Sequence, residues 1–197
     1  MGERLGLKAL RCDSPKCAQV RRPFRPGMHG HKRSKRTLSD FGRQLKEKQK
    51  FKLSYGVDER GLRRLFLDAH RKTGSTAEEL MRLLERRLDN VVFRLGFARS
   101  RRVARQLISH GHILVDARRV KSPGYLTQIG DIISIHEKSK SKGSIQATLT
   151  ESMKIHEPPS WLSLDKEKKE GKMIAYPQDD DLKAPFEVSL LIESFSK

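Results

Sequence analysis

The spacing of the apolar residues changes at Gly111, and this change limits the folds open to the chain. Before Gly111 the apolar side chains recur three or four residues apart, which predicts amphipathic helices. After it they occur in short runs between turn residues, as in residues 113–115 and 131–135, which predicts short strands separated by turns. The predicted class is therefore α+β, with helices first and a small antiparallel sheet after them.

Four helices are expected ahead of Gly111, over residues 40–55, 58–69, 76–95 and 98–110. Ser39 is a residue type that caps helix N-termini, and Gly56 favours a helix end. Ser75 with Glu78 three positions later is the pattern of a capping box for the third helix. Residues 1–36 are rich in Pro, Gly and basic side chains, so we expect them to be irregular.

Beyond Gly111, strands are expected at residues 113–115, 119–120, 125–126 and 131–135, with turns between them. A Lys- and Ser-rich linker is expected at 139–143, and one more helix at 145–155. Further strands are expected at 161–164, 173–174 and 188–192. The acidic run 179–181 is expected to be an exposed turn.

Positive charge is the second constraint. The chain has 42 Lys and Arg against 24 Asp and Glu, a net charge of +18, and the excess lies ahead of residue 144. Such a basic surface indicates a polyanionic partner, and nucleic acid fits best. A membrane partner is not expected, because the most basic stretch, residues 21–52, lacks a stripe of bulky apolar residues. The first ten residues carry no secretory signal, so we expect the chain to stay where it is made.

Four arginines, Arg99, Arg101, Arg102 and Arg105, are expected on the open side of the helix at 98–110. Residues four positions apart point the same way, so Arg101 and Arg105 should lie together. Each planar guanidinium group can hold a phosphate bidentately. Because A-form RNA hides its base edges in a deep groove, such a surface would read backbone shape. A plain solvated helix face is the alternative interpretation.

Cys12 and Cys17 are the only cysteines of the chain. They are too few for the disulfide framework of a small secreted protein. His29 and His31 are nearby in sequence, so a thiol role and a metal role both stay open.

Residues 87–97 (RLDNVVFRLGF), 100–115 and 130–135 (GDIISI) resemble the S4 RNA-binding domain. Upstream, residues 26–30, 38–42 and 45–50 with Tyr55 and Gly56 resemble the N-terminal domain of the bacterial ribosomal protein S4 family. Residues 161–165 and 194–197 resemble its C-terminal part. The S4 domain alone also occurs in RNA-modifying enzymes, whereas the combined set of segments is specific for the ribosomal family.

The resemblance implies an α+β fold: an irregular basic N-terminal segment and small helical domain, then an S4 domain of two helices plus a small antiparallel sheet, then C-terminal strands. The implied domains are a basic N-terminal domain over 1–86, the S4 RNA-binding domain over 87–150, and a C-terminal extension over 151–197 whose strands pack on the preceding domains.

The resemblance also implies a function. Members of this family are structural constituents of the small ribosomal subunit and primary binders of 16S ribosomal RNA that nucleate the body of the subunit. The resemblance further implies that the protein contributes to the region where messenger RNA enters the subunit, and to translational accuracy. The expected partners are 16S ribosomal RNA, neighbouring small-subunit proteins, in particular ribosomal protein S5, and messenger RNA. The expected location is the cytoplasm, in the small subunit.

Carried across by position, the resemblance implies RNA-facing side chains in both domains. In the S4 domain they are Arg99, Arg101, Arg102, Arg105, His110, His112, Arg118 and Arg119. In the N-terminal domain they are Lys32, Arg33, Lys35 and Arg36, near the path of messenger RNA in the family, and Arg43, Lys46, Lys48, Lys50 and Lys52.

Two departures from the family pattern stand out. The first hairpin turn reads Val115-Asp-Ala-Arg118, where most members have Asn-Gly. Alanine is disfavoured at the positive φ that Asn-Gly adopts in a type I′ turn. We therefore expect a different turn or a slightly longer loop.

The second departure concerns zinc. Some relatives carry two cysteine pairs in a four-thiolate site, and Cys12 and Cys17 resemble the second pair, while the first pair is absent. A structural zinc prefers four ligands, so we expect no ordered zinc or other cofactor in this chain. Residues 1–4 resemble the middle of the N-terminal segment of those relatives, so we expect an upstream segment to be missing. His29 could complete a Cys2His2 set with His31, but it lies in the Pro-Gly-x-His-Gly element, where a hydrogen-bonded or RNA-facing imidazole is the better interpretation.

Two rival functions share the S4 domain. A pseudouridine synthase uses an aspartate in a Gly-Arg-Leu-Asp setting, which residues 86–89 mimic, but Asp89 is expected to cap the helix or pair with a neighbouring arginine. Too little chain follows residue 135 for a catalytic domain. A factor that rescues or recycles ribosomal subunits would lack the basic first domain. The sequence contains no nucleophile and base pair or Gly-rich phosphate loop, so no enzyme activity is expected.

Overall fold

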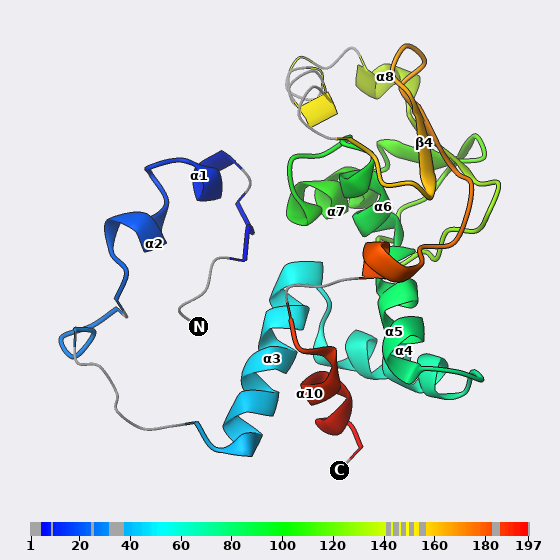
Figure 1. Cartoon of the computed structure of the whole chain (residues 1–197). Coiled ribbons are helices and arrows are strands. Elements are labelled where there is room, and N and C mark those ends of the chain that lie inside the picture. The colour runs from blue at the N-terminus through cyan, green and yellow to red at the C-terminus, as the bar shows by residue number, and fades with distance from the viewer. Residues whose placement is uncertain are drawn as a thin grey trace. The chain divides into compact units, whose positions relative to one another are not determined.

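The computed structural model describes residues 5–8, 10–24, 26–31, 38–140, 143, 146, 149, 152–153, 157–182 and 186–196. The chain forms two compact units, one from residues 1–66 and 184–197 and the other from residues 67–183 (Figure 1). Helices and a small antiparallel sheet both occur, which confirms the predicted α+β class. The predicted domains 1–86, 87–150 and 151–197 rest on sequence resemblance rather than on compactness, and they stay predictions.

The first unit is built on α3, Asp40–Tyr55, which confirms the first predicted helix. The Ser39 hydroxyl accepts a hydrogen bond from the Gly42 amide at 3.2 Å. Gly56 ends the helix in the left-handed conformation, with φ 63°. Two one-turn helices, α1 (Leu10–Asp13) and α2 (Ala18–Arg21), lie in the otherwise irregular N-terminal segment. α4, Glu59–His70, follows α3 and continues into the second unit.

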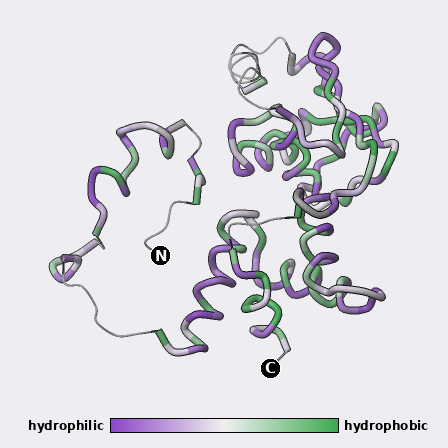
Figure 2. Tube along the Cα trace, in the orientation of Figure 1, coloured by the Kyte–Doolittle hydropathy of each residue, from purple (hydrophilic) through white to green (hydrophobic). Residues whose placement is uncertain are grey.

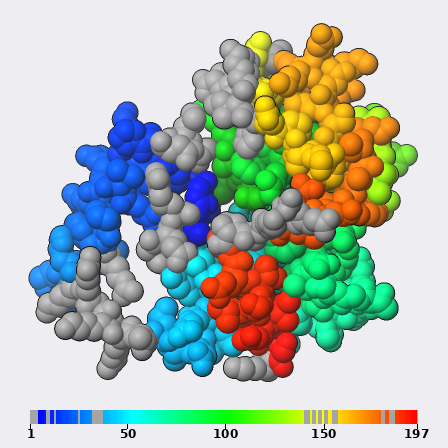
Figure 3. All heavy atoms as spheres, in the orientation of Figure 1, coloured from blue at the N-terminus to red at the C-terminus, as the bar shows by residue number. Residues whose placement is uncertain are grey.

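An aromatic core holds α10, Val188–Glu193, on α3. The rings of Phe51 and Phe186 lie 5.0 Å apart between centroids, and those of Phe66 and Phe195 lie 5.1 Å apart. In Figure 3 the red C-terminal residues lie against the cyan residues of α3. Figure 2 shows hydrophilic residues recurring along α3. Of its apolar residues, Phe51 and Tyr55 are buried, whereas Phe41, Leu45 and Leu53 are exposed.

The strand predicted at residues 188–192 is wrong, because these residues form α10. A short apolar run cannot be assigned to a strand or a helix by its pattern alone. Leu191 is fully buried, and the Gln44 amide on α3 donates a hydrogen bond to the Glu193 carboxylate at 3.0 Å. The neighbour of this segment is a helix face rather than a strand edge, and that contact decides its conformation.

The helices of the second unit that precede Gly111 are α5 (Thr76–Glu85), α6 (Leu88–Arg94) and α7 (Arg101–Ser109). The predicted capping signal of α5 is confirmed, since the Ser75 hydroxyl accepts from the Glu78 amide at 3.5 Å. Ser100 caps α7 in the same way, accepting from the Val103 amide at 3.3 Å. The helix predicted at 98–110 is therefore present, with slightly tighter bounds.

The prediction of a single helix over residues 76–95 is wrong. Arg87 has an extended conformation, with ψ 137°, and separates α5 from α6. Arg87 forms a β-bridge with Leu126. The amide of Leu88 donates to the carbonyl of Tyr125 at 2.8 Å. These bonds to a segment nearly forty positions away in sequence replace intrahelical ones. They also explain why the strand predicted at 125–126 is an isolated bridge.

The five strands form one antiparallel sheet in the order β2-β1-β3-β5-β4. Their bounds are β1 Ile113–Val115, β2 Arg118–Arg119, β3 Ile132–Ile135, β4 Leu162–Asp165 and β5 Glu170–Met173. The strands predicted at 113–115 and 131–135 are confirmed, and those predicted at 119–120, 161–164 and 173–174 are displaced by one to a few residues. A short helix, α8 (Glu137–Lys140), covers the start of the predicted linker, and the acidic run begins a 3₁₀ turn, η1 (Asp179–Leu182).

One face of this sheet packs on α6 and α7 around fully buried side chains that include Phe97, Ile108 and Ile133. Gly171 on β5 lies so close to α6 that a Cβ there would come within 2.4 Å of Leu95 Cδ1. The helix predicted at 145–155 lies largely outside the described residues. The hairpin of β1 and β2 forms one edge of the sheet. Arg119 on β2 lies close to Gly111, which follows α7.

The β1–β2 turn consists of two residues, Asp116 and Ala117, with φ 48° and 63°. Positive φ at both central positions is the geometry of a type I′ turn. The expectation that this sequence would form another turn type or a longer loop is therefore wrong. Asp116 secures the turn to β3: its amide donates to the Ile132 carbonyl at 2.9 Å, and its carboxylate accepts from the Ile132 amide at 3.0 Å. This anchoring holds Ala117 in a conformation that alanine disfavours.

Ala117→Gly should raise the free energy of unfolding by about 1 kcal/mol, because glycine adopts positive φ without a Cβ penalty. Denaturant unfolding followed by circular dichroism measures the change. Ala104→Gly, inside α7, is the matched control and should lower stability by at least about 1 kcal/mol. A less stable Ala117→Gly variant would contradict the inference that Ala117 is strained by its positive φ.

Candidate nucleic-acid interface

The arginines of α7 lie off the stripe that the helix buries. Ala104 and Ile108 are fully buried, whereas Arg102 is exposed and Arg101 and Arg105 are half-buried. All three side chains therefore reach the surface of one helix, as the sequence predicts. Arg99, which precedes the helix, is also half-buried.

A chain of hydrogen bonds across α5, α6 and α7 orients Arg101. Glu85 is 1% exposed, and its carboxylate accepts from the Asn90 side-chain amide at 2.8 Å. The amide nitrogen of Asn90 thus faces Glu85, and its oxygen accepts from Arg101 Nε at 2.7 Å. The Arg101 guanidinium also lies 4.9 Å from the ring centroid of Phe93. Arg101 is held from two directions while part of it stays at the surface.

Asp89 anchors two more arginines. Its carboxylate is 1% exposed and accepts two hydrogen bonds from Arg87, at 3.1 and 2.7 Å. Arg105 Nη1 lies 3.8 Å from the same carboxylate. The prediction that Asp89 pairs with a neighbouring arginine is confirmed. A buried carboxylate needs such partners, because losing them would leave a charge unsolvated.

The hairpin presents Arg118 and Arg119, both exposed, on β2. Arg119 Nη2 lies 2.9 Å from His136 Nε2. An arginine only donates hydrogen bonds, so His136 Nε2 is the acceptor in this contact. Arg119 also lies across Gly111, where a Cβ would come within 2.8 Å of Arg119 Cδ. This glycine lets Arg119 lie against the end of α7.

The two predicted histidines differ in their surroundings. His112 Nδ1 lies 2.8 Å from the Ser139 hydroxyl, which fixes its ring. His110 is exposed, and its ring centroid lies 6.0 Å from that of His112.

The basic residues of α3 are mostly paired within the first unit. Lys50 is buried, and its ammonium lies 2.6 Å from the Glu47 carboxylate. Lys48 and Lys52 both pair with Glu59, at 3.0 and 2.9 Å. Lys46 is half-buried, and Arg43 is exposed. Much of the charge that the sequence places on this helix is therefore balanced by nearby carboxylates.

Three side chains, Glu59, Glu79 and Tyr125, have pKa values shifted by their surroundings. The hydrogen bond from Lys52, with help from Lys48, holds the pKa of Glu59 below its ordinary value of 4.5. Burial raises the pKa of Glu79, but hydrogen bonds from Lys72 and Arg82 outweigh it and hold that pKa below the ordinary value. Burial, with the nearby charge of Asp131, raises the pKa of Tyr125.

The remaining predicted residues, Lys32, Arg33, Lys35 and Arg36, lie outside the described residues. Cys17 is buried and Cys12 half-buried. Within the described ranges, no group of three or more His, Cys, Asp and Glu side chains is placed to hold a metal. Cys12 and Cys17 supply two of the four ligands that a structural zinc prefers.

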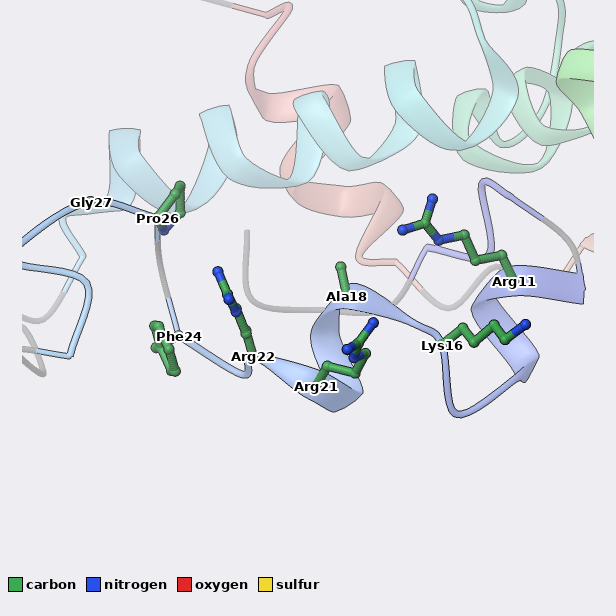
Figure 4. Close-up of a pocket in the computed structure, with 8 residues that line it drawn as sticks. All are labelled: Arg11, Lys16, Ala18, Arg21, Arg22, Phe24, Pro26 and Gly27. Atoms are coloured by element: carbon green, nitrogen blue, oxygen red, sulfur yellow. The ribbon is translucent and has the colours of Figure 1, made fainter.

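Four basic residues that the sequence reasoning did not single out line one pocket in the first unit. Arg11, Lys16, Arg21 and Arg22 surround an open pocket of about 590 Å³ together with Phe24, Ala18, Pro26 and Gly27 (Figure 4). A signal was present: Arg21 and Arg22 stand within three positions of an aromatic residue in a Pro-rich stretch. Aromatic side chains among basic ones are typical of sites for unpaired nucleotides.

The chain matches the family described as the ribosomal protein S4/S9 N-terminal domain over residues 2–85 and the S4 domain over residues 86–133. These matches, with the arginine face of α7 beside the hairpin, define the class: an RNA-binding ribosomal protein that carries an S4 domain.

Curated relatives agree over the whole chain. The small ribosomal subunit protein uS4 of Thermus thermophilus is 50% identical, and those of Thermoanaerobacter sp. and Acetivibrio thermocellus are 46% identical. Each alignment covers 100% of this chain and 93% of the relative. The chain belongs to the uS4 family of small ribosomal subunit proteins. This membership confirms the prediction of a ribosomal protein rather than an enzyme.

Asn90→Ala should lower the free energy of unfolding by about 2–3 kcal/mol, because it leaves the buried Glu85 carboxylate and Arg101 without a shared partner. Denaturant unfolding measures the loss. Gln106→Ala, an exposed polar residue on α7, is the control and should change stability by less than about 0.5 kcal/mol. Equal effects of the two substitutions would contradict a linked network.

Glu59→Gln should lower stability at neutral pH but have no effect in acid. The pKa of Glu59 is depressed by folding, so its contribution is present above the pKa of the unfolded chain and is lost as pH falls through the lower folded pKa. Thermal melts of both proteins between neutral pH and pH values below 4.5 measure the difference. A stability gap that persists in acid would show that Glu59 does not act through its charge.

Proposed function

We propose that this protein is a primary binder of 16S ribosomal RNA that joins the small subunit early and holds a multi-helix RNA junction in its body. The α7 arginines carry the proposal: Arg101 and Arg105 are anchored by Asn90 and Asp89, and Arg102 is exposed beside them. Guanidinium groups held in place lose less entropy when they bind a phosphate. The family membership supports the same function.

The hairpin extends this surface. Arg118 and Arg119 follow the β1–β2 turn, and Arg119 contacts His136 and lies close over Gly111. Such contacts to phosphate and sugar position an RNA without reading its sequence. The protein would therefore recognise the shape of a folded junction.

The remaining partners follow from the same assignment. The protein works in the cytoplasm as part of the small subunit. Lys32, Arg33, Lys35 and Arg36 lie along the path of messenger RNA, ribosomal protein S5 is a neighbour, and the protein influences translational accuracy. No zinc or other cofactor is part of this proposal, because Cys12 and Cys17 supply two of the four ligands that a structural zinc prefers. In the described part of the chain, no helix is both long enough and apolar enough to cross a bilayer.

Binding to the 5′ domain of 16S ribosomal RNA should weaken steeply with salt. Each phosphate contact releases counterions and contributes roughly −0.7 to −0.9 to the slope of log K against log salt. Filter binding over a range of KCl concentrations measures the slope. A slope near zero would contradict the proposed function.

Arg102→Gln should reduce the size of that slope by about 1 and leave the folded state unchanged, because Arg102 is exposed on α7. Arg101→Gln should reduce affinity and stability together, since Arg101 also completes the hydrogen bonds of Asn90. Lys166→Gln removes the same charge from an exposed turn after β4 and is the control, which should leave the slope unchanged. Equal slopes for the Arg102 and Lys166 variants would exclude α7 as the RNA-binding face.

A further inference from the structure

The pocket between α1, α2 and the following loop has a different character from the α7 surface. Figure 4 shows Lys16 at one end of it and Phe24, Pro26 and Gly27 at the other, with Arg21 and Arg22 between. On α7, Arg101 and Arg105 are anchored to an amide and a carboxylate, whereas this pocket is lined by basic and small or apolar residues without a carboxylate among them. It needs an explanation of its own.

The four cations of the pocket have no counter-ion within the described part of the chain. No side chain of Arg11, Lys16, Arg21 or Arg22 forms an ion pair or hydrogen bond with another described residue. Like charges gathered around a concave surface raise its positive potential and favour an anion there. Arginine forks suit phosphate oxygens in particular.

The size and apolar wall of the pocket indicate more than a phosphate. Its volume of about 590 Å³ falls in the range of pockets that bury small organic molecules, roughly 300–1,000 Å³. Phe24 is 42% exposed, and its ring packs on that of His31 with centroids 3.7 Å apart. A partly exposed aromatic ring at the wall of a cationic pocket can stack a flat base while the cations hold phosphates.

We propose that this pocket takes one unstacked nucleotide of ribosomal RNA, with its base against Phe24 and the phosphates on either side of it on Arg11, Lys16, Arg21 and Arg22. This inference rests on the proposed function, since it names the RNA element that the first unit binds. A nucleotide within an A-form duplex cannot enter, because its base is stacked and paired. The ligand is therefore a bulge or a loop nucleotide.

An acidic peptide fits the pocket less well. Carboxylates would balance the four cations, but they would offer no flat group to the Phe24 ring. A nucleotide satisfies both the charge and the aromatic wall with one ligand.

The test compares two short RNA duplexes that differ by a single bulged nucleotide, bound to the full chain. The unaltered protein should bind the bulged duplex about ten-fold more tightly than the perfect duplex, the size expected for stacking one base on an aromatic ring. Phe24→Leu should abolish this preference while leaving affinity for the perfect duplex unchanged. Arg21→Gln with Arg22→Gln should weaken binding of the bulged duplex more than binding of the perfect one.

Arg60→Gln with Arg63→Gln is the matched control, because it removes two exposed arginines from α4 in the same unit. It should lower both affinities equally and keep the ten-fold preference. Circular dichroism and thermal melting establish that each variant is folded as the unaltered protein is. 2-Aminopurine at the bulged position gives a second readout, since its fluorescence should change on binding to the unaltered protein and not to Phe24→Leu.

Two outcomes would overturn the proposal that the pocket binds a nucleotide. A preference for the bulge that survives Phe24→Leu, or no preference in the unaltered protein, would show that the pocket does not hold a nucleotide. Strong, salt-dependent binding of 16S ribosomal RNA in the same experiment would leave the proposed function standing. If the unaltered protein binds no RNA at all, the proposed function fails and the pocket proposal fails with it.

Discussion

The pairing of two buried carboxylates with arginines is the interaction on which the second unit depends. Glu85 and Asp89 are each 1% exposed, and each is satisfied by side chains from more than one position: Asn90 and Arg94 for Glu85, Arg87 and Arg105 for Asp89. Buried charges without such partners are costly. Because the bonds run across α5, α6 and α7, the same contacts that join the helices also orient the guanidinium groups at the surface. Stability and the capacity to meet phosphates come from one network.

The chain divides its positive charge into two kinds. On α3, Glu47 and Glu59 neutralise Lys48, Lys50 and Lys52, so this helix contributes less free charge than its composition indicates. On α7 and around the N-terminal pocket, the cations are anchored from behind or have no described counter-ion. These ion pairs do not change the net charge of +18. They decide instead which cations stay available to bind the phosphates of RNA.

Sequence patterns predicted the local features well. The caps at Ser39 and Ser75, the end of α3 at Gly56 and the change to strands after Gly111 all follow from short-range chemistry. The errors lie where a distant segment decides. Arg87 breaks a helix because Leu126 pairs with it, and α10 is helical because α3 lies beside it. The I′ turn at Ala117 is imposed by the register of β1 with β2 and β3, which outweighs the preference of alanine.

The sequence by itself determined the α+β class, the polyanionic partner and the ribosomal family, because apolar period, net charge and residue motifs are properties of the chain read in order. The tertiary structure alone decided which cations are available. Whether a lysine or arginine is open depends on carboxylates and amides brought to it by folding, as Asn90 is to Arg101 and Glu59 to Lys48 and Lys52. The pocket of Arg11, Lys16, Arg21 and Arg22 exists for the same reason: two one-turn helices and a loop bring these side chains around one space.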